Sequence, residues 1–160
     1  MTTQQTALAI DLISKDVTPF TALTFTTQAT LQTLEQYNSV PEKLYNEAQR
    51  LGVTPTGAIQ YIYTDVNGDS GHAFQLSIAL PVSDTQGIPN GFTYTTFRSF
   101  RCVSYTHVGP WSDFPALYNM LFAQFHREGY KGGSIVREVY TVVDFEDPAN
   151  CVTEIQISIT

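Results

Sequence analysis

Two carboxylates near the C-terminal end of the chain are the first candidates for chemistry. Glu154 stands in CVTEIQISIT, residues 151–160, among apolar and β-branched residues where a carboxylate costs packing and solvation unless another group uses it. Glu138 stands in a similar run, SIVREVYTVV. Such a carboxylate can neutralise a bound cation, or it can act as a general base if burial raises its pKa.

Side chains alternate between the two faces of a strand, and this alternation groups the candidates. Glu138 and Tyr140 share one face of their strand, and Glu154 and Gln156 share one face of theirs. If the two strands pair, we expect all four side chains on one surface, although the register of the pair does not follow from sequence.

Two interpretations of this surface are open. In the first, Glu138 and Glu154 are hydrated residues on the exposed face of an antiparallel sheet. In the second, at least one of them lies at the bottom of an aromatic cavity, where ring faces cover a bound cation. The rings expected there are Tyr61, Tyr63, Tyr105, Trp111 and Tyr140.

Patterns for other chemistries are missing from the sequence. His72, His107 and His126 lack the i, i+4 spacing of a helical metal pair, so we expect no metal site. Cys102 and His107 are five residues apart on one expected strand and face opposite ways, which argues against a cysteine–histidine nucleophile. Neither a Walker motif nor a dinucleotide fingerprint occurs, and we expect no cofactor.

The elements that position these residues form a repeat. A shift of 77 residues places Tyr63 on Tyr140 and Ile78 on Ile155, and it places Tyr61 on Glu138. Each half reads strand, helix, strand, strand. The first half has strands at 21–30, 57–64 and 73–82 and a helix at 41–52; the second has strands at 97–107, 134–143 and 151–159 and a helix at 114–129.

We therefore expect a single α+β domain over residues 1–160. Repeat one covers about residues 17–82, a linker about 83–96, and repeat two about 97–160, while residues 1 to about 16 add a short strand or an arm. One helix cannot cover both faces of a three-stranded sheet, so the repeats should join into an antiparallel sheet with two helices. We expect a central ligand cleft at the pseudo-twofold junction of the repeats.

Composition limits the partners. Eight Lys and Arg against fifteen Asp and Glu give a net charge of −7, and the basic residues are scattered, which argues against direct nucleic acid binding. The N-terminal segment lacks the basic start of a signal peptide, and no apolar run has the ~20 residues that span a bilayer. We expect a cytoplasmic protein that does not bind membranes.

Three segments in order resemble the GyrI-like family of small-molecule effector-binding domains, which occur alone or fused to AraC-type and MerR-type DNA-binding heads. The segments are YTHVGPWSDF (105–114), REVYTV (137–142) and VTEIQISI (152–159). The resemblance implies an aromatic ligand cleft between the repeats with the acidic residue of the terminal strand, Glu154, at its centre. It also matches Glu138 and Tyr140 to the family's E-x-Y pair and places Trp111 where an aromatic follows the Gly-Pro step.

Three functions are compatible with this resemblance. The first is a free-standing protein that senses or sequesters a hydrophobic cation, as multidrug sensors do, alone or through a partner regulator. The second is a hydrolase of cyclopropane-bearing or other strained electrophiles, in which Glu154 activates water. The third is an interaction protein that inhibits gyrase. About 16 residues before repeat one cannot hold a helix-turn-helix domain, so we expect no one-component regulator.

Overall fold

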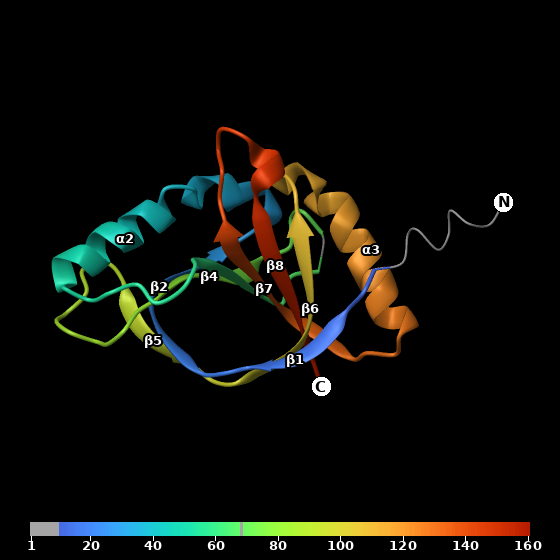
Figure 1. Cartoon of the computed structure of the whole chain (residues 1–160), viewed down its shortest axis with the longest axis horizontal. Coiled ribbons are helices and arrows are strands. Elements are labelled where there is room, and N and C mark those ends of the chain that lie inside the picture. The colour runs from blue at the N-terminus through green and yellow to red at the C-terminus, as the bar shows by residue number, and fades with distance from the viewer. Residues whose placement is uncertain (1–9, 68) are drawn as a thin grey trace.

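Eight antiparallel strands form one sheet in the order β1-β6-β8-β7-β3-β4-β2-β5 (Figure 1). The computed structural model describes residues 10–67 and 69–160. The strands are β1 (Ile13–Val17), β2 (Phe20–Ala29), β3 (Gln60–Thr64), β4 (Phe74–Pro81), β5 (Thr93–Phe97), β6 (Phe100–Val108), β7 (Gly132–Val142) and β8 (Val152–Ile159). The helices are α2 (Val40–Leu51) and α3 (Phe114–Arg127), with short 3-10 helices η1 (Leu31–Tyr37), η2 (Trp111–Asp113) and η3 (Pro148–Asn150).

The expected α+β class, with an antiparallel sheet and two helices, is confirmed. The elements β2-α2-β3-β4 are followed by β6-α3-β7-β8, so the strand-helix-strand-strand order occurs twice. Across the sheet the second unit has the strand order β6-β8-β7, and the first unit has its equivalent strands in the reverse order, β3-β4-β2. The two units join edge to edge through β7 and β3. The segment expected to be a plain linker contains most of β5, whose TYTTF sequence is rich in β-branched and aromatic residues that favour strands.

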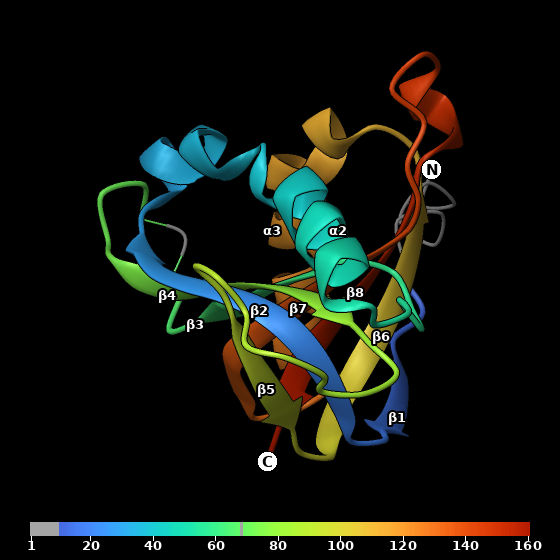
Figure 2. The same ribbon diagram turned by 90° about the vertical axis from the view of Figure 1, so that its left-hand side faces the viewer.

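Both helices cover the same face of the sheet, which we call the helix face (Figure 2). α2 buries Val40, Leu44 and Ala48, and α3 buries Leu117, Leu121 and Phe125 at helical spacing. These side chains pack with the apolar residues of β4 and β8 in one large core. α2 ends at Gly52, whose positive φ of 76° lets its N–H bond back to the carbonyls of Ala48 and Gln49.

The other face, which we call the inner face, lies on the concave side of a strongly curved sheet. β1 and β5 are the two edge strands of the sheet, and β2 lies next to β5. Only Thr18 and Pro19 connect β1 to β2. Three residue steps reach at most roughly 11 Å, so the two edges must approach each other. Arg98 and Ser99 make a matching corner between β5 and β6, and the two connections run together along the bottom of Figure 1.

Within the part of the chain that the structure describes, no helix is long and apolar enough to cross a membrane.

Candidate ligand-binding site around Glu138

The junction of the two repeats places Glu138 opposite its own counterpart. Glu138 of β7 pairs directly with Tyr61 of β3, the residue that the 77-residue shift aligns with it. A position that faces its own equivalent lies on the pseudo-twofold axis that relates the repeats. Tyr63 and Tyr140, which are also equivalents, lie on either side of this axis on the same face of the sheet.

Three tyrosine hydroxyls donate hydrogen bonds to the Glu138 carboxylate. Tyr63 Oη donates to Oε1 at 2.8 Å, and Tyr140 Oη donates to the same oxygen. Tyr118 Oη, from α3, donates to Oε2 at 2.5 Å. Glu138 is only 4% exposed, and among the described residues no basic side chain is ion-paired with it.

Aromatic rings connect this buried carboxylate with the surface. The Tyr140 ring lies edge-to-face against Tyr61 at 5.2 Å between centroids and against Trp111 at 5.4 Å. Trp111 in turn contacts Phe145 of the β7–β8 hairpin at 5.9 Å. Trp111 is 38% exposed and Phe145 81% exposed, so the aromatic cluster that begins at the buried Glu138 carboxyl presents apolar ring surface to solvent.

Burial raises the pKa of the Glu138 carboxyl, and the hydrogen bonds from Tyr118, Tyr140 and Tyr63 counteract part of that rise because they stabilise the ionised form. The pKa of Tyr61 is raised to about 12 by burial and by the charge of Glu138. The same two causes hold the pKa values of Tyr63, Tyr118 and Tyr140 well above the usual value for tyrosine. These hydroxyls therefore keep their protons and remain donors at neutral pH.

Glu154 lies on the opposite face of the sheet, so the expectation that it shares a surface with Glu138 and Tyr140 is wrong. The β7–β8 register pairs Glu138 with Ile155, whereas Glu154 pairs with Val139 and Gln156 with Arg137. Residues that pair directly point to the same face, and a register offset of one residue therefore moves Glu154 and Gln156 to the inner face. Among the described residues, the hydrogen-bond partners of Glu154 are Lys15, Ser104 and Gln156, and none of the expected aromatic residues is among them.

On the inner face Glu154 is paired within the protein. Its Oε2 accepts hydrogen bonds from Lys15 Nζ at 2.6 Å, Ser104 Oγ at 2.7 Å and Gln156 Nε2 at 3.0 Å. Burial favours a higher pKa for Glu154, but these hydrogen bonds outweigh it and hold the pKa below the usual value. This carboxylate already has a cationic partner.

A family comparison identifies the fold. The family described as the GyrI-like small molecule binding domain matches residues 13–160. The chain belongs to the GyrI-like family. No curated protein sequence matches this GyrI-like chain significantly.

Solved structures with the GyrI-like fold are similar over almost the whole chain at low identity. EcmrR, solved in a complex with DNA, has a TM-score of 0.83 at 16% identity; the match covers 99% of this chain but only 60% of EcmrR. SAV2435, solved bound to tetraphenylphosphonium, has a TM-score of 0.68 at 12% identity, covering 94% of each chain. A hydrolase encoded by lin2189 of Listeria innocua has a TM-score of 0.61 at 12% identity, covering 99% of this chain and 97% of that one.

The structure brings most of the predicted aromatic residues together and adds two. Tyr61, Tyr63, Tyr140 and Trp111 gather around Glu138, while Tyr105 lies on the helix face beside Ile155. Tyr118 and Phe145 are new to the set. The spacing of Phe114, Tyr118 and Phe122 along one side of α3 is a signal that could have identified Tyr118, since i, i+4 residues share a helix face.

The remaining reactive side chains do not converge. His107 Nε2 lies 3.0 Å from Asp113 Oδ2, just before α3, and Cys102 and Cys151 are free and buried. Among the described residues no three His, Cys, Asp or Glu side chains are grouped so that they could hold a metal ion.

Proposed function

We propose that this GyrI-like domain binds a lipophilic organic cation over Glu138, with Tyr61, Trp111 and Tyr140 as its aromatic walls. The observation that carries the proposal is a buried carboxylate that is held by three tyrosine hydroxyls and, within residues 10–67 and 69–160, by no basic side chain. An ionised carboxylate at such depth is costly without a counter-charge, and a bound cation supplies one. Ring faces around it add cation–π attraction.

The occupied lone pairs of Glu138 favour one kind of cation. Two hydroxyls bind Oε1 and a third binds Oε2, so few acceptor positions remain for a ligand that must donate hydrogen bonds. A bulky cation with a covered charge and no N–H groups fits this arrangement better than a primary amine. The tetraphenylphosphonium ion bound by SAV2435 has this chemistry, which supports the proposal.

A titration of the fluorescence of Trp111 tests the proposal, because Trp111 is the single tryptophan of the chain. Tetraphenylphosphonium should quench it saturably, and neutral triphenylphosphine oxide should bind much more weakly. Glu138→Gln should lower the affinity for the cation by roughly 10- to 100-fold. Glu154→Gln, the matched control on the inner face, should leave it unchanged; equal effects of both variants would refute the assignment.

A second candidate function is hydrolysis assisted by Glu138. Burial raises the pKa of Glu138 and makes it the better base, whereas the pKa of Glu154 is lowered and Lys15 occupies it. The lin2189 neighbour is described as a hydrolase, which favours testing this. Turnover of a cyclopropane-bearing electrophile that is lost in Glu138→Gln would support it, and reversible release of unchanged compound would argue for binding alone. The gyrase-interaction hypothesis remains a prediction, to be tested by reversing surface acids.

A further inference from the structure

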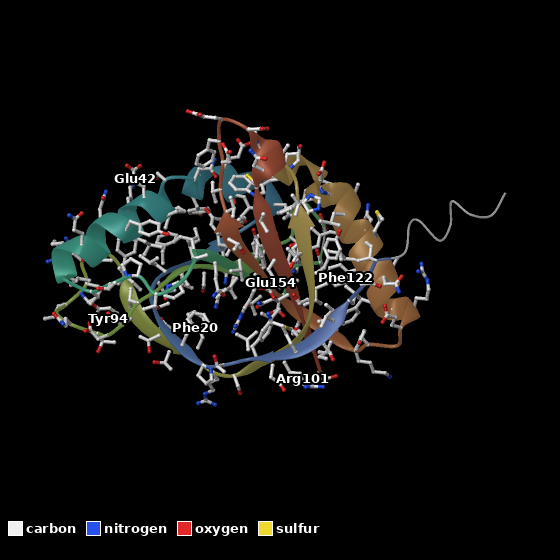
Figure 3. All side chains as sticks on the ribbon, viewed as in Figure 1. Phe20, Glu42, Tyr94, Arg101, Phe122 and Glu154 are labelled. Atoms are coloured by element: carbon white, nitrogen blue, oxygen red, sulfur yellow. The ribbon has the colours of Figure 1, made fainter. Side chains whose placement is uncertain are left out.

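The inner face of the sheet buries an arginine that has no acidic partner in the part of the chain that the structure describes. Arg137 of β7 is 5% exposed and points away from the proposed cation site, because its neighbour Glu138 occupies the helix face. Its guanidinium carbon lies 3.9 Å from the ring centroid of Phe100, 5.6 Å from that of Phe97 and 5.7 Å from that of Phe20. These three rings come from the two tight corners where the sheet edges approach, and Figure 3 shows Phe20 on the inner side.

The hydrogen-bonding groups of Arg137 are not satisfied by the described residues. Nε and Nη1 are buried and have no partner among residues 10–67 and 69–160. The side-chain oxygens of Gln60 and Gln156, also on the inner face, are unpartnered in the same way. Buried polar groups in native proteins are almost always paired, so this group of atoms is expected to bind something polar.

No described acid neutralises Arg137. Glu154 is ion-paired with Lys15, and no described acidic side chain is paired with Arg137. Two other basic residues of this region are already ion-paired: Lys15 is paired with Glu154, and Arg101 of β6 is paired with Asp16 of β1. Arg137 is therefore a buried base on the inner face whose charge the described ion pairs leave unbalanced.

We propose that the inner face binds a small monovalent anion, of the size of chloride or of a carboxylate group, at the guanidinium of Arg137. The Phe100 ring covers one face of the guanidinium, so the anion approaches the N–H edge, where Nε and Nη1 donate. A single buried positive charge is balanced by a single negative one, which disfavours divalent anions. Since Gln60 and Gln156 offer acceptors nearby, the anion is expected to be hydrated or to carry a hydroxyl group.

Burial lowers the pKa of Arg137 to about 10, which still leaves the guanidinium protonated at neutral pH. The need for a counter-ion therefore persists over the physiological range. The site is separate from the proposed cation site, because it uses the other face of β7.

Thermal unfolding at constant ionic strength tests the proposal. The reference salt is sodium gluconate, whose anion is too large for the proposed site, and it is replaced stepwise by sodium chloride, formate or hydrogencarbonate. At least one small anion should raise the Tm of the wild type by several degrees in a saturable way. Arg137→Met should abolish this rise, while Arg101→Met, at an exposed arginine on the outer rim in Figure 3, and Glu138→Gln should keep it.

If Arg137→Met does not fold, the Nε–H resonance of Arg137 in the ¹H–¹⁵N spectrum of the wild-type protein provides the second readout. It should shift saturably with the anion that raises the Tm. A Tm that ignores the identity of the anion, an equal rise in Arg137→Met, or an unmoved Nε–H resonance would each overturn the proposal.

Discussion

Tyr61 and Glu138 pair directly across the junction of the two repeats, although they are the same position in the two copies. In a symmetric dimer of single repeats that position would face an identical residue, and two glutamates there would repel each other. Within one chain the two copies can differ. Here one supplies a carboxylate and the other an aromatic ring, which is the asymmetry that a cation site requires.

Cation affinity should rise with pH. The pKa of Glu138 is raised in the free protein, and a bound cation favours the ionised form, so binding releases a proton below and around that pKa. The dissociation constant for tetraphenylphosphonium, measured by Trp111 fluorescence from pH 4 to pH 8, should fall as pH rises through the pKa of Glu138 and then level off. Glu138→Gln should show no such change; a flat profile in the wild type would contradict the proposed site.

Glu138→Gln should also flatten the pH dependence of stability. A carboxyl whose pKa is raised on folding binds more protons in the folded state, so this group makes the free energy of unfolding fall as pH rises from the unfolded pKa through the folded one. The variant, which is always neutral, avoids this loss. At pH 7 it should equal or exceed the wild type by about 1 kcal/mol in urea unfolding. A strongly destabilised variant at pH 7 would show that the ionised carboxylate is a structural requirement.

Tyr118→Phe should weaken cation binding through its effect on Glu138, although Tyr118 is not one of the proposed aromatic walls. The substitution removes the hydrogen bond to Glu138 Oε2, so the pKa of Glu138 should rise further and a smaller fraction of the carboxyl should be ionised near that pKa. We expect a several-fold loss of affinity below and around the pKa of Glu138 that shrinks as the pH rises above it. Tyr45→Phe, at an exposed tyrosine of α2, is the matched control. A loss that does not vary with pH would assign Tyr118 a packing role instead.

The pair of Lys15 and Glu154 should contribute to stability and not to cation binding. Their side chains are in contact at 2.6 Å but partly exposed, so a double-mutant cycle with Lys15→Met and Glu154→Gln should give a coupling of only about 0.5 kcal/mol. Both single variants should bind tetraphenylphosphonium like the wild type. A tenfold loss in Glu154→Gln would restore the residue to the ligand site.

Sequence patterns predicted most of the helices and strands, because each of these elements depends mainly on residues that are close together in the sequence. Alternation and helical spacing locate every strand of both repeats and both helices to within three residues, and the 77-residue shift predicts the repeat. Register is different, since pairing Glu138 with Ile155 instead of Glu154 changes no local preference yet exchanges the faces. The surroundings of Arg137 could not be predicted from local patterns either, because the three phenylalanine rings around its guanidinium come from two corners that only the curvature of the sheet brings together.

The pairing of β1 with β6 also bears on how the chain folds. Ile13 lies opposite Ser104, 91 residues further along, and Lys15 reaches Glu154 from the other end of the described chain. Contacts between such distant residues form only after the entropy of closing a long loop has been lost. We therefore expect refolding in milliseconds to seconds, slower than for helical proteins of this length.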